Sequence, residues 1–293
     1  MNIISFDLSG KIDQPTVSAL TLLKREADAL CIPFFVVGAS ARDILLKHCY
    51  GINPPRATRD VDLGVRVADW ENYNRLTDAL IATGKFNATR ERQRFCFETV
   101  LIDIVPFGAI ADERKRISWP PEHEIFMSMF AFEESYECAI TVRLSSSPEL
   151  DIRLPILPGL ALMKIVSWEE RYPDRAKDAE DLLLIMNSYE AAGNFERLYG
   201  QEQGLLQAEG FDTRLAGIRL LGRDMAKMAD HDTAEVVRRI LCSETDRISQ
   251  YRLVVDMIHG RPRFDETFDE TRLQVEKLKE GFLEIILDNH PGE

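Results

Sequence analysis

Arg56-Ala-Thr-Arg-Asp60-Val-Asp62-Leu63 is the stretch that decides the fold of this 293-residue chain. Apolar residues at every second position from Asp60 to Val67 predict a strand with one buried face. Because residues i and i+2 of a strand project from the same face, Asp60 and Asp62 point the same way, roughly 6 to 7 Å apart. Two carboxylates this close repel each other, and a divalent cation that prefers hard oxygen ligands, such as Mg²⁺, relieves that repulsion.

A third carboxylate, Asp103, interrupts an apolar strand predicted over residues 100–105. An acid in such a strand needs a partner or a ligand. If this strand lies beside the Asp60 strand, the three acids form a cluster that can hold two Mg²⁺ ions. One ion would acidify an attacking hydroxyl and the other would bind a triphosphate and the leaving pyrophosphate. Asp103 is also a candidate for accepting the hydroxyl proton. The alternative is an ordinary acid on an edge strand.

Upstream, a buried strand predicted over residues 34–37 runs through a Gly-Ala-Ser turn into a helix. Gly38 lets the backbone turn sharply, the free N–H groups of the helix start favour a phosphate, and the Ser40 hydroxyl adds a donor. Arg42 is expected to pair with phosphate or with Asp43. The predicted nucleotide-binding residues of this segment are Gly38, Ala39, Ser40 and Arg42. A strand–glycine–helix turn by itself is weakly specific, and the order of the three segments carries the prediction.

The remaining pattern predicts an α+β fold class. Further strands are expected at 94–97 and near 125–132, 137–144 and 150–154, with Pro106 ending the Asp103 strand. After Leu154-Pro155 the periodicity is helical throughout. We therefore expect a mixed β-sheet with flanking helices over residues 1–155, the catalytic domain, followed by an all-helical domain over 156–293.

Composition narrows the classes of protein that remain. The formal net charge is −13, which argues against a broad nucleic-acid-binding surface. The basic runs at 90–94 and 113–116 are either solvated faces or the lining of a local groove. No apolar run has the length of a membrane span and the start lacks a signal-peptide pattern, so no membrane partner and a cytoplasmic location are expected. The five scattered cysteines suggest reduced thiols, and no zinc-ligand spacing occurs.

The ordered set, a strand–Gly-x-Ser–helix, an Arg-x-Thr-x-Asp-x-Asp strand and a strand with one acid, resembles the DNA polymerase beta-type nucleotidyltransferase superfamily. The segment VVGASARDILL (36–46) resembles the VGGAVRDxLL opening of CCA-adding and poly(A) polymerases, with Ala39 in place of the second glycine. The arginine–aspartate motif with which those enzymes select bases was not found downstream.

A second resemblance, covering about residues 30 to 190, is to the AbiEii/AbiGii-type nucleotidyltransferases known from abortive-infection toxin–antitoxin systems. It adds a helical tail motif, matched here by Leu160, Lys164, Arg171, Lys177, Asp178, Asp181 and Leu182. Ser167 and Lys177 stand where family members usually carry alanine and arginine. The resemblance implies that Lys164 contacts the triphosphate and that Asp178 supports it. The residues alone, without the resemblance, favour a solvated lysine at position 164 and a first-turn acid at position 178.

Together these features predict a metal-dependent enzyme that moves an NMP from an NTP to an acceptor hydroxyl. The resemblance implies an acceptor that is a tRNA end or a protein side chain, a toxic activity and a cognate antitoxin. Three alternatives stay open: a small-molecule adenylyltransferase of the drug-modifying kind, a catalytically silent partner-binding protein of the same fold, and a phosphate-binding regulator without transfer chemistry.

Overall fold

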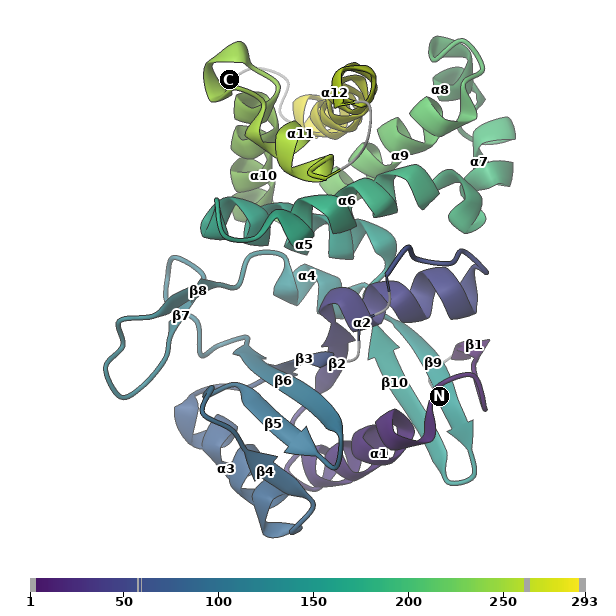
Figure 1. The fold of residues 1–293 in the computed structure, drawn as a ribbon. Coiled ribbons are helices and arrows are strands. Elements are labelled where there is room, and N and C mark those ends of the chain that lie inside the picture. Colours follow the sequence, from purple (N-terminus) through teal and green to yellow (C-terminus); the bar gives the residue numbers. More distant parts are fainter. Residues whose placement is uncertain (1–3, 57, 59, 261–263, 290–293) are drawn as a thin grey trace. The chain divides into compact units, whose positions relative to one another are not determined.

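The computed structural model describes residues 4–56, 58, 60–260 and 264–289, so Ala57 and Arg59 of the stretch 56–63 lie outside the described residues. The chain divides into two compact units, residues 1–156 and 157–293 (Figure 1). The first unit mixes strands and helices, and every regular element described in the second is a helix. The predicted α+β class, a mixed sheet with flanking helices followed by an all-helical region, is confirmed.

The first unit is built around a five-stranded sheet in the order β2-β3-β6-β5-β4. Its strands are β2 (Phe34–Val37), β3 (Val61–Arg66), β4 (Phe86–Ala88), β5 (Arg94–Phe97) and β6 (Val100–Phe107). The central pair β3–β6 is parallel and the other pairs are antiparallel, which makes the sheet mixed. The side chains of Val61, Leu63 and Val65 are buried, as the alternation of that strand predicts.

Two smaller sheets complete the strands of this unit. The sheet β1-β9-β10 contains β1 (Ile4–Asp7), β9 (Ile140–Ser146) and β10 (Glu149–Leu154), and the ribbon β7–β8 contains β7 (Arg116–Ser118) and β8 (Phe126–Ser128). The strand signals near 137–144 and 150–154 were therefore correct, but these strands pair with each other and with β1 instead of joining the Asp62 sheet.

Helices pack against the strands of this unit. They are α1 (Gln14–Ala29), α2 (Gly38–Asp43) with its π-helical continuation η1 (Ile44–Cys49), α3 (Trp70–Ala82) and α4 (Phe132–Glu137). Side chains cap the N-termini of α1 and α3: the Asp13 and Asp69 carboxylates accept backbone N–H groups of Thr16 and Asn72. Helix α4 replaces the end of a strand predicted over 125–132, and its aromatic residue Phe132 packs against Phe35 and Phe107 of the sheet.

The prediction that Pro106 ends the Asp103 strand is wrong. Strand β6 continues to Phe107, and Pro106 pairs with Val65. The amide of Ile104 donates to Gln93 on the β5 side of β6. Residue 106 is two positions on, so its backbone nitrogen points to the same side, where β5 has already ended. A proline costs no ladder hydrogen bond at such a position.

The second unit consists of helices. They are α5 (Leu157–Arg171), α6 (Ala176–Ser188), η2 (Glu190–Asn194), α7 (Phe195–Tyr199), α8 (Gln203–Ala208), α9 (Thr213–Met228), α10 (His231–Glu244), η3 (Arg247–Ser249), α11 (Arg252–Met257) and α12 (Phe264–Asn289). Asp212 caps α9, whereas among the described residues no side chain caps α6. Within the described part of the chain, no helix is both long and apolar enough to span a bilayer.

Helices α9 and α12 approach each other through two glycines. A Cβ atom on Gly281 would lie 1.9 Å from the carbonyl oxygen of Arg219, and one on Gly222 would lie 2.2 Å from the carbonyl oxygen of Leu278. Real Cβ atoms do not approach backbone oxygens so closely, so neither position admits a side chain unless the helices separate. These two glycines set the contact distance of the pair.

Gly281→Ala should therefore destabilise the protein by about 2 to 3 kcal/mol, because the added methyl group forces two packed backbones apart. Urea unfolding followed by far-UV circular dichroism measures this loss. Gly204→Ala is the matched control, since a Cβ on this helical glycine meets no atom within 4 Å. Alanine's higher helix propensity should leave that variant as stable as the parent or slightly more so. Equal stability of both variants would contradict the close contact.

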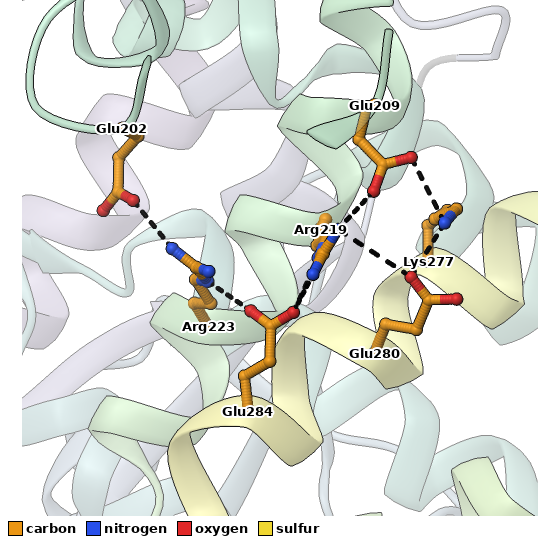
Figure 2. A network of polar contacts seen from close by, with 7 residues as sticks. All are labelled: Glu202, Glu209, Arg219, Arg223, Lys277, Glu280 and Glu284. Atoms are coloured by element: carbon orange, nitrogen blue, oxygen red, sulfur yellow. Dashed lines mark hydrogen bonds and ion pairs between the residues drawn. The ribbon is translucent and has the colours of Figure 1, made fainter. Parts of the chain in front are cut away.

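Charged side chains line the same helix pair (Figure 2). Arg219 donates to Glu284 at 2.7 Å and to Glu209 at 2.6 Å, while Arg223 donates to the other oxygen of Glu284 at 2.6 Å. Lys277 adds an ion pair to Glu209 at 3.2 Å. Because the Glu209 side chain is only 4% exposed, this network fixes the register of α9 and α12 more firmly than a solvated ion pair does.

Candidate active site

One row of residues crosses the five-stranded sheet and carries the candidate chemistry. Val37 on β2 pairs with Asp62 on β3, Asp62 pairs with Asp103 on β6, and Asp103 pairs with Arg94 on β5. Side chains at paired positions project from the same face, and neighbouring strands lie about 4.8 Å apart. The strand pairing that we inferred between the Asp62 and Asp103 segments is therefore present, and the two carboxylates are direct neighbours.

Gly38 is placed directly against this row. Its φ is +65°, a backbone conformation that favours glycine, and a Cβ on Gly38 would lie 2.2 Å from the Oδ2 atom of Asp62. Both the turn and the approach of the carboxylate thus require glycine here. Ala39, the next residue, is half-buried. The predicted turn brings the start of α2 beside Asp62.

The Ser40 hydroxyl is a local tie between α2 and β3. It donates to the carbonyl of Val37 at 3.0 Å and accepts the backbone N–H of Asp62 at 3.3 Å. Its side chain is buried. In this conformation Ser40 positions Asp62, and its proton is already used within the protein.

Of the two partners considered for Arg42, the structure shows Asp43. The Arg42 Nε atom donates to Asp43 at 2.9 Å, and Arg42 is only 1% exposed. The other oxygen of Asp43 accepts the backbone N–H of Thr58 at 2.9 Å. This pair therefore ties α2 to the segment that enters β3, and it leaves Arg42 little surface with which to touch a ligand.

Arg94 is the functional candidate that we missed. Its Nε and Nη2 atoms each donate to one oxygen of Asp103 at 2.7 Å, and Nη2 lies 3.6 Å from Oδ2 of Asp60. These hydrogen bonds raise the pKa of Arg94 above its ordinary value, so the guanidinium stays charged. A signal existed: strands 94–97 and 100–105 are joined by two residues, which places Arg94 opposite Asp103.

Asp60 and Asp62 lie at the start of β3 and Asp103 lies within β6, but the three acids are not gathered as a closed metal cage. Among the described residues, no group of three or more histidine, cysteine or acidic side chains has the arrangement of a metal site. The donor chemistry nevertheless fits a divalent ion, since carboxylate oxygens are its preferred ligands. The Arg94 guanidinium between Asp60 and Asp103 shows that this cluster already binds positive charge.

A cavity of about 510 Å³ adjoins Asp60 within the same unit. Its lining includes Ser40, Thr58 and Asp60 beside Lys47 and His48. Burial, together with the nearby Lys47 and Lys11 charges, lowers the pKa of His48. Ligand pockets for small molecules commonly have volumes of about 300 to 1,000 Å³, so the cavity has room for a nucleotide-sized group.

Lys164 and Asp178, predicted from the helical tail, come together in the second unit. The Lys164 ammonium donates to Asp178 at 2.6 Å and lies 2.8 Å from Asp181, while Ser167 donates to Asp178 at 2.9 Å. Burial opposes the charge, but the two carboxylates outweigh it and hold the pKa of Lys164 above its ordinary value. Lys164 is thus no solvated lysine, since it belongs to a buried triad.

No known family profile matches the chain, and no curated protein sequence matches it. The similar solved structures include ANT(2'')-Ia in complex with adenylyl-2''-tobramycin, with 16% identity, 68% of this chain and 98% of that chain covered, and a TM-score of 0.36. A CCA-adding enzyme in complex with ATP has 16% identity, 95% and 71% coverage and a TM-score of 0.33. The Thermotoga maritima CCA-adding enzyme complexed with tRNA has 12% identity, 95% and 83% coverage and a TM-score of 0.28.

These solved structures are nucleotidyltransferases, the superfamily that the motifs resemble. Their TM-scores lie below 0.5 and their identities below 25%. Likeness at this level leaves the family and the activity of this chain to be argued from its own residues.

Proposed function

We propose that this protein is a metal-dependent nucleotidyltransferase that moves an NMP from an NTP to an acceptor hydroxyl. The single observation that carries the proposal is the pairing of Asp62 with Asp103 on neighbouring strands, beside the turn at Gly38. The positive φ of Gly38 brings this turn into contact with the Asp62 carboxylate. Asp60 stands one residue before β3 on the same segment. We assign residues 1–155, which fall within the first unit, as the catalytic domain.

In the proposed site Asp60, Asp62 and Asp103 hold Mg²⁺, with two ions expected during turnover. When bound, the metal supplies a lower pKa for the acceptor hydroxyl and positive charge beside the triphosphate. The chain's own groups do the rest. The turn at Gly38, Ala39 and Ser40 fixes Asp62, and Asp103 is positioned to accept the hydroxyl proton once the guanidinium of Arg94 has left it.

The acceptor is the finer part of the proposal. The resemblance to AbiEii/AbiGii-type enzymes favours a tRNA end or a protein side chain, a toxic activity and a cognate antitoxin. With a net charge of −13, tRNA would have to meet a concentrated basic patch. A second candidate acceptor is a small molecule, since the cavity beside Asp60 has the volume of a small-molecule site.

The proposal is tested by following where a label goes. The full chain is incubated with Mg²⁺ and each α-³²P-labelled NTP in turn, together with bulk tRNA, a cell extract or a set of aminoglycosides. Covalent label on RNA, on protein or on a small molecule identifies the acceptor class. Label on none of them, together with no change in thermal stability on adding any NTP, would overturn the proposed transfer activity.

A further inference from the structure

The Arg94 side chain lies against two of the three acids of the proposed metal site, Asp103 and Asp60. It forms a two-pronged hydrogen-bonded pair with Asp103, in which both carboxylate oxygens are engaged at 2.7 Å. A second carboxylate, Asp60, lies 3.6 Å from the same nitrogen, and Glu91 lies 3.5 Å from the other terminal nitrogen. The Arg94 guanidinium thus forms ion pairs with three carboxylates, those of Asp103, Asp60 and Glu91.

This arrangement puts a fixed cation where a divalent ion would have to bind. A guanidinium at hydrogen-bond distance from both oxygens repels a second cation approaching the same carboxylate. In the Arg94–Asp103 pair the arginine side chain is 26% exposed and the aspartate side chain 15% exposed, so solvent reaches the guanidinium. The guanidinium can therefore exchange its partner without unfolding the sheet.

A triphosphate offers such a partner. Phosphate oxygens accept the forked N–H groups of arginine in the same geometry as a carboxylate and carry more negative charge. Transfer of Arg94 from Asp103 to an incoming phosphate would free the carboxylate and add positive charge beside the nucleotide. The strand β5 that carries Arg94 would not need to move, because only the side chain changes its partner.

We propose that Arg94 is a built-in competitor of the divalent ion at Asp103, and that binding of an NTP releases it. The inference depends on the proposed nucleotidyltransferase function. It makes the metal and the nucleotide bind together, and it leaves the protein with low affinity for free metal. Arg94 is accordingly a positioning residue in the resting site and a phosphate contact in the loaded one.

Titration of the full chain with Mn²⁺ alone, followed by the electron paramagnetic resonance signal of the free ion, tests the competition without any turnover. Arg94→Gln should bind Mn²⁺ about tenfold or more tightly than the parent, because Asp103 no longer has to lose a charge-assisted pair. Arg94→Lys should fall between the two, since an ammonium cannot form the two-pronged contact, and it serves if Arg94→Gln fails to fold. Asp103→Asn, added to Arg94→Gln, should abolish the increase in Mn²⁺ affinity.

Arg92→Gln is the matched control. It removes the same charge from the same segment, but Arg92 pairs with Glu122 and with the backbone carbonyl of Trp119, away from the carboxylate row. Its Mn²⁺ affinity should equal that of the parent. An equal gain in Arg92→Gln would reduce the effect to general electrostatics and overturn the proposal.

The same titration is repeated with the α,β-methylene analogues of ATP, GTP, CTP and UTP in turn. The gap between parent and Arg94→Gln should shrink to less than about threefold with the analogue that binds, because the nucleotide has then released Arg94. Equal or weaker Mn²⁺ binding by Arg94→Gln without nucleotide overturns the competition while the metal site stands. Absence of Mn²⁺ binding in every variant, with and without the analogues, overturns the proposed function and the inference with it.

Discussion

Asp62→Asn is expected to reduce nucleotidyl transfer by about 100- to 1,000-fold while leaving the fold intact. The substitution removes a negative charge from the centre of the row but keeps the volume of the side chain. Loss of a single electrostatic contact to the reacting groups has an effect of about this size in other enzymes, on the order of 2.7 to 4 kcal/mol.

The conservative change matters at this position. The Oδ2 atom of Asp62 fills the space that a Cβ on Gly38 would take, so alanine would leave a hole beside the turn. The backbone N–H of Asp62 also donates to Ser40, a contact that asparagine retains. The asparagine variant therefore separates the loss of charge from a collapse of the Gly38 turn.

Asp69→Asn is the matched control for this prediction. Asp69 caps α3 in the same unit, and asparagine caps a helix about as well as aspartate. Its transfer rate should equal that of the parent. The label-transfer assay and a thermal melt measure both quantities. Unchanged transfer by Asp62→Asn would remove Asp62 from the site, and a comparable loss in Asp69→Asn would attribute the effect to instability.

Much of the site could be predicted because it depends on local patterns. Alternation in one strand put Asp60 and Asp62 on one segment, and a single acid in an apolar strand identified Asp103. Their neighbourhood then required only the pairing β3–β6, which the structure has. The tight turn at Gly38 followed from a strand–glycine–helix pattern and is confirmed by its positive φ.

The counter-ions could not be predicted in the same way. A single acid in an apolar strand indicates that the acid needs a cationic partner, but it does not indicate which residue supplies the cation. The basic run at 90–94 contains three arginines, and only the register of a two-residue hairpin selects Arg94. Lys164 shows the same limit: helical spacing brings it near Asp178 only once α5 and α6 are packed, a tertiary contact with no local signal.

Lys164→Met is expected to lower the free energy of unfolding by about 3 to 5 kcal/mol, the second large effect. The change leaves Asp178 and Asp181 buried without their cation, with side chains 6% and 4% exposed. Removal of one partner from a buried ion cluster costs far more than the cluster contributes net, because the remaining charges cannot be solvated. Urea or thermal unfolding measures the loss.

Two variants sharpen this prediction. Lys227→Met removes a half-exposed lysine whose nearest acid, Asp224, is 3.7 Å away, and it should change stability by less than about 0.5 kcal/mol. The triple variant Lys164→Met, Asp178→Asn, Asp181→Asn removes the uncompensated charge and should recover part of the loss. Failure of the triple variant to recover any stability would mean that packing, not charge, explains the effect.

The Lys164→Met variant also tests whether Lys164 takes part in the reaction. The Lys164 ammonium lies 2.6 and 2.8 Å from two carboxylates, which compensate its positive charge and weaken its attraction for a triphosphate. We therefore expect the transfer rate per folded molecule of Lys164→Met to stay within about threefold of the parent rate. A tenfold change in rate would correspond to about 1.4 kcal/mol in the activation free energy. A fall of tenfold or more, measured on a sample shown to be folded, would instead support the triphosphate contact that the family resemblance implies.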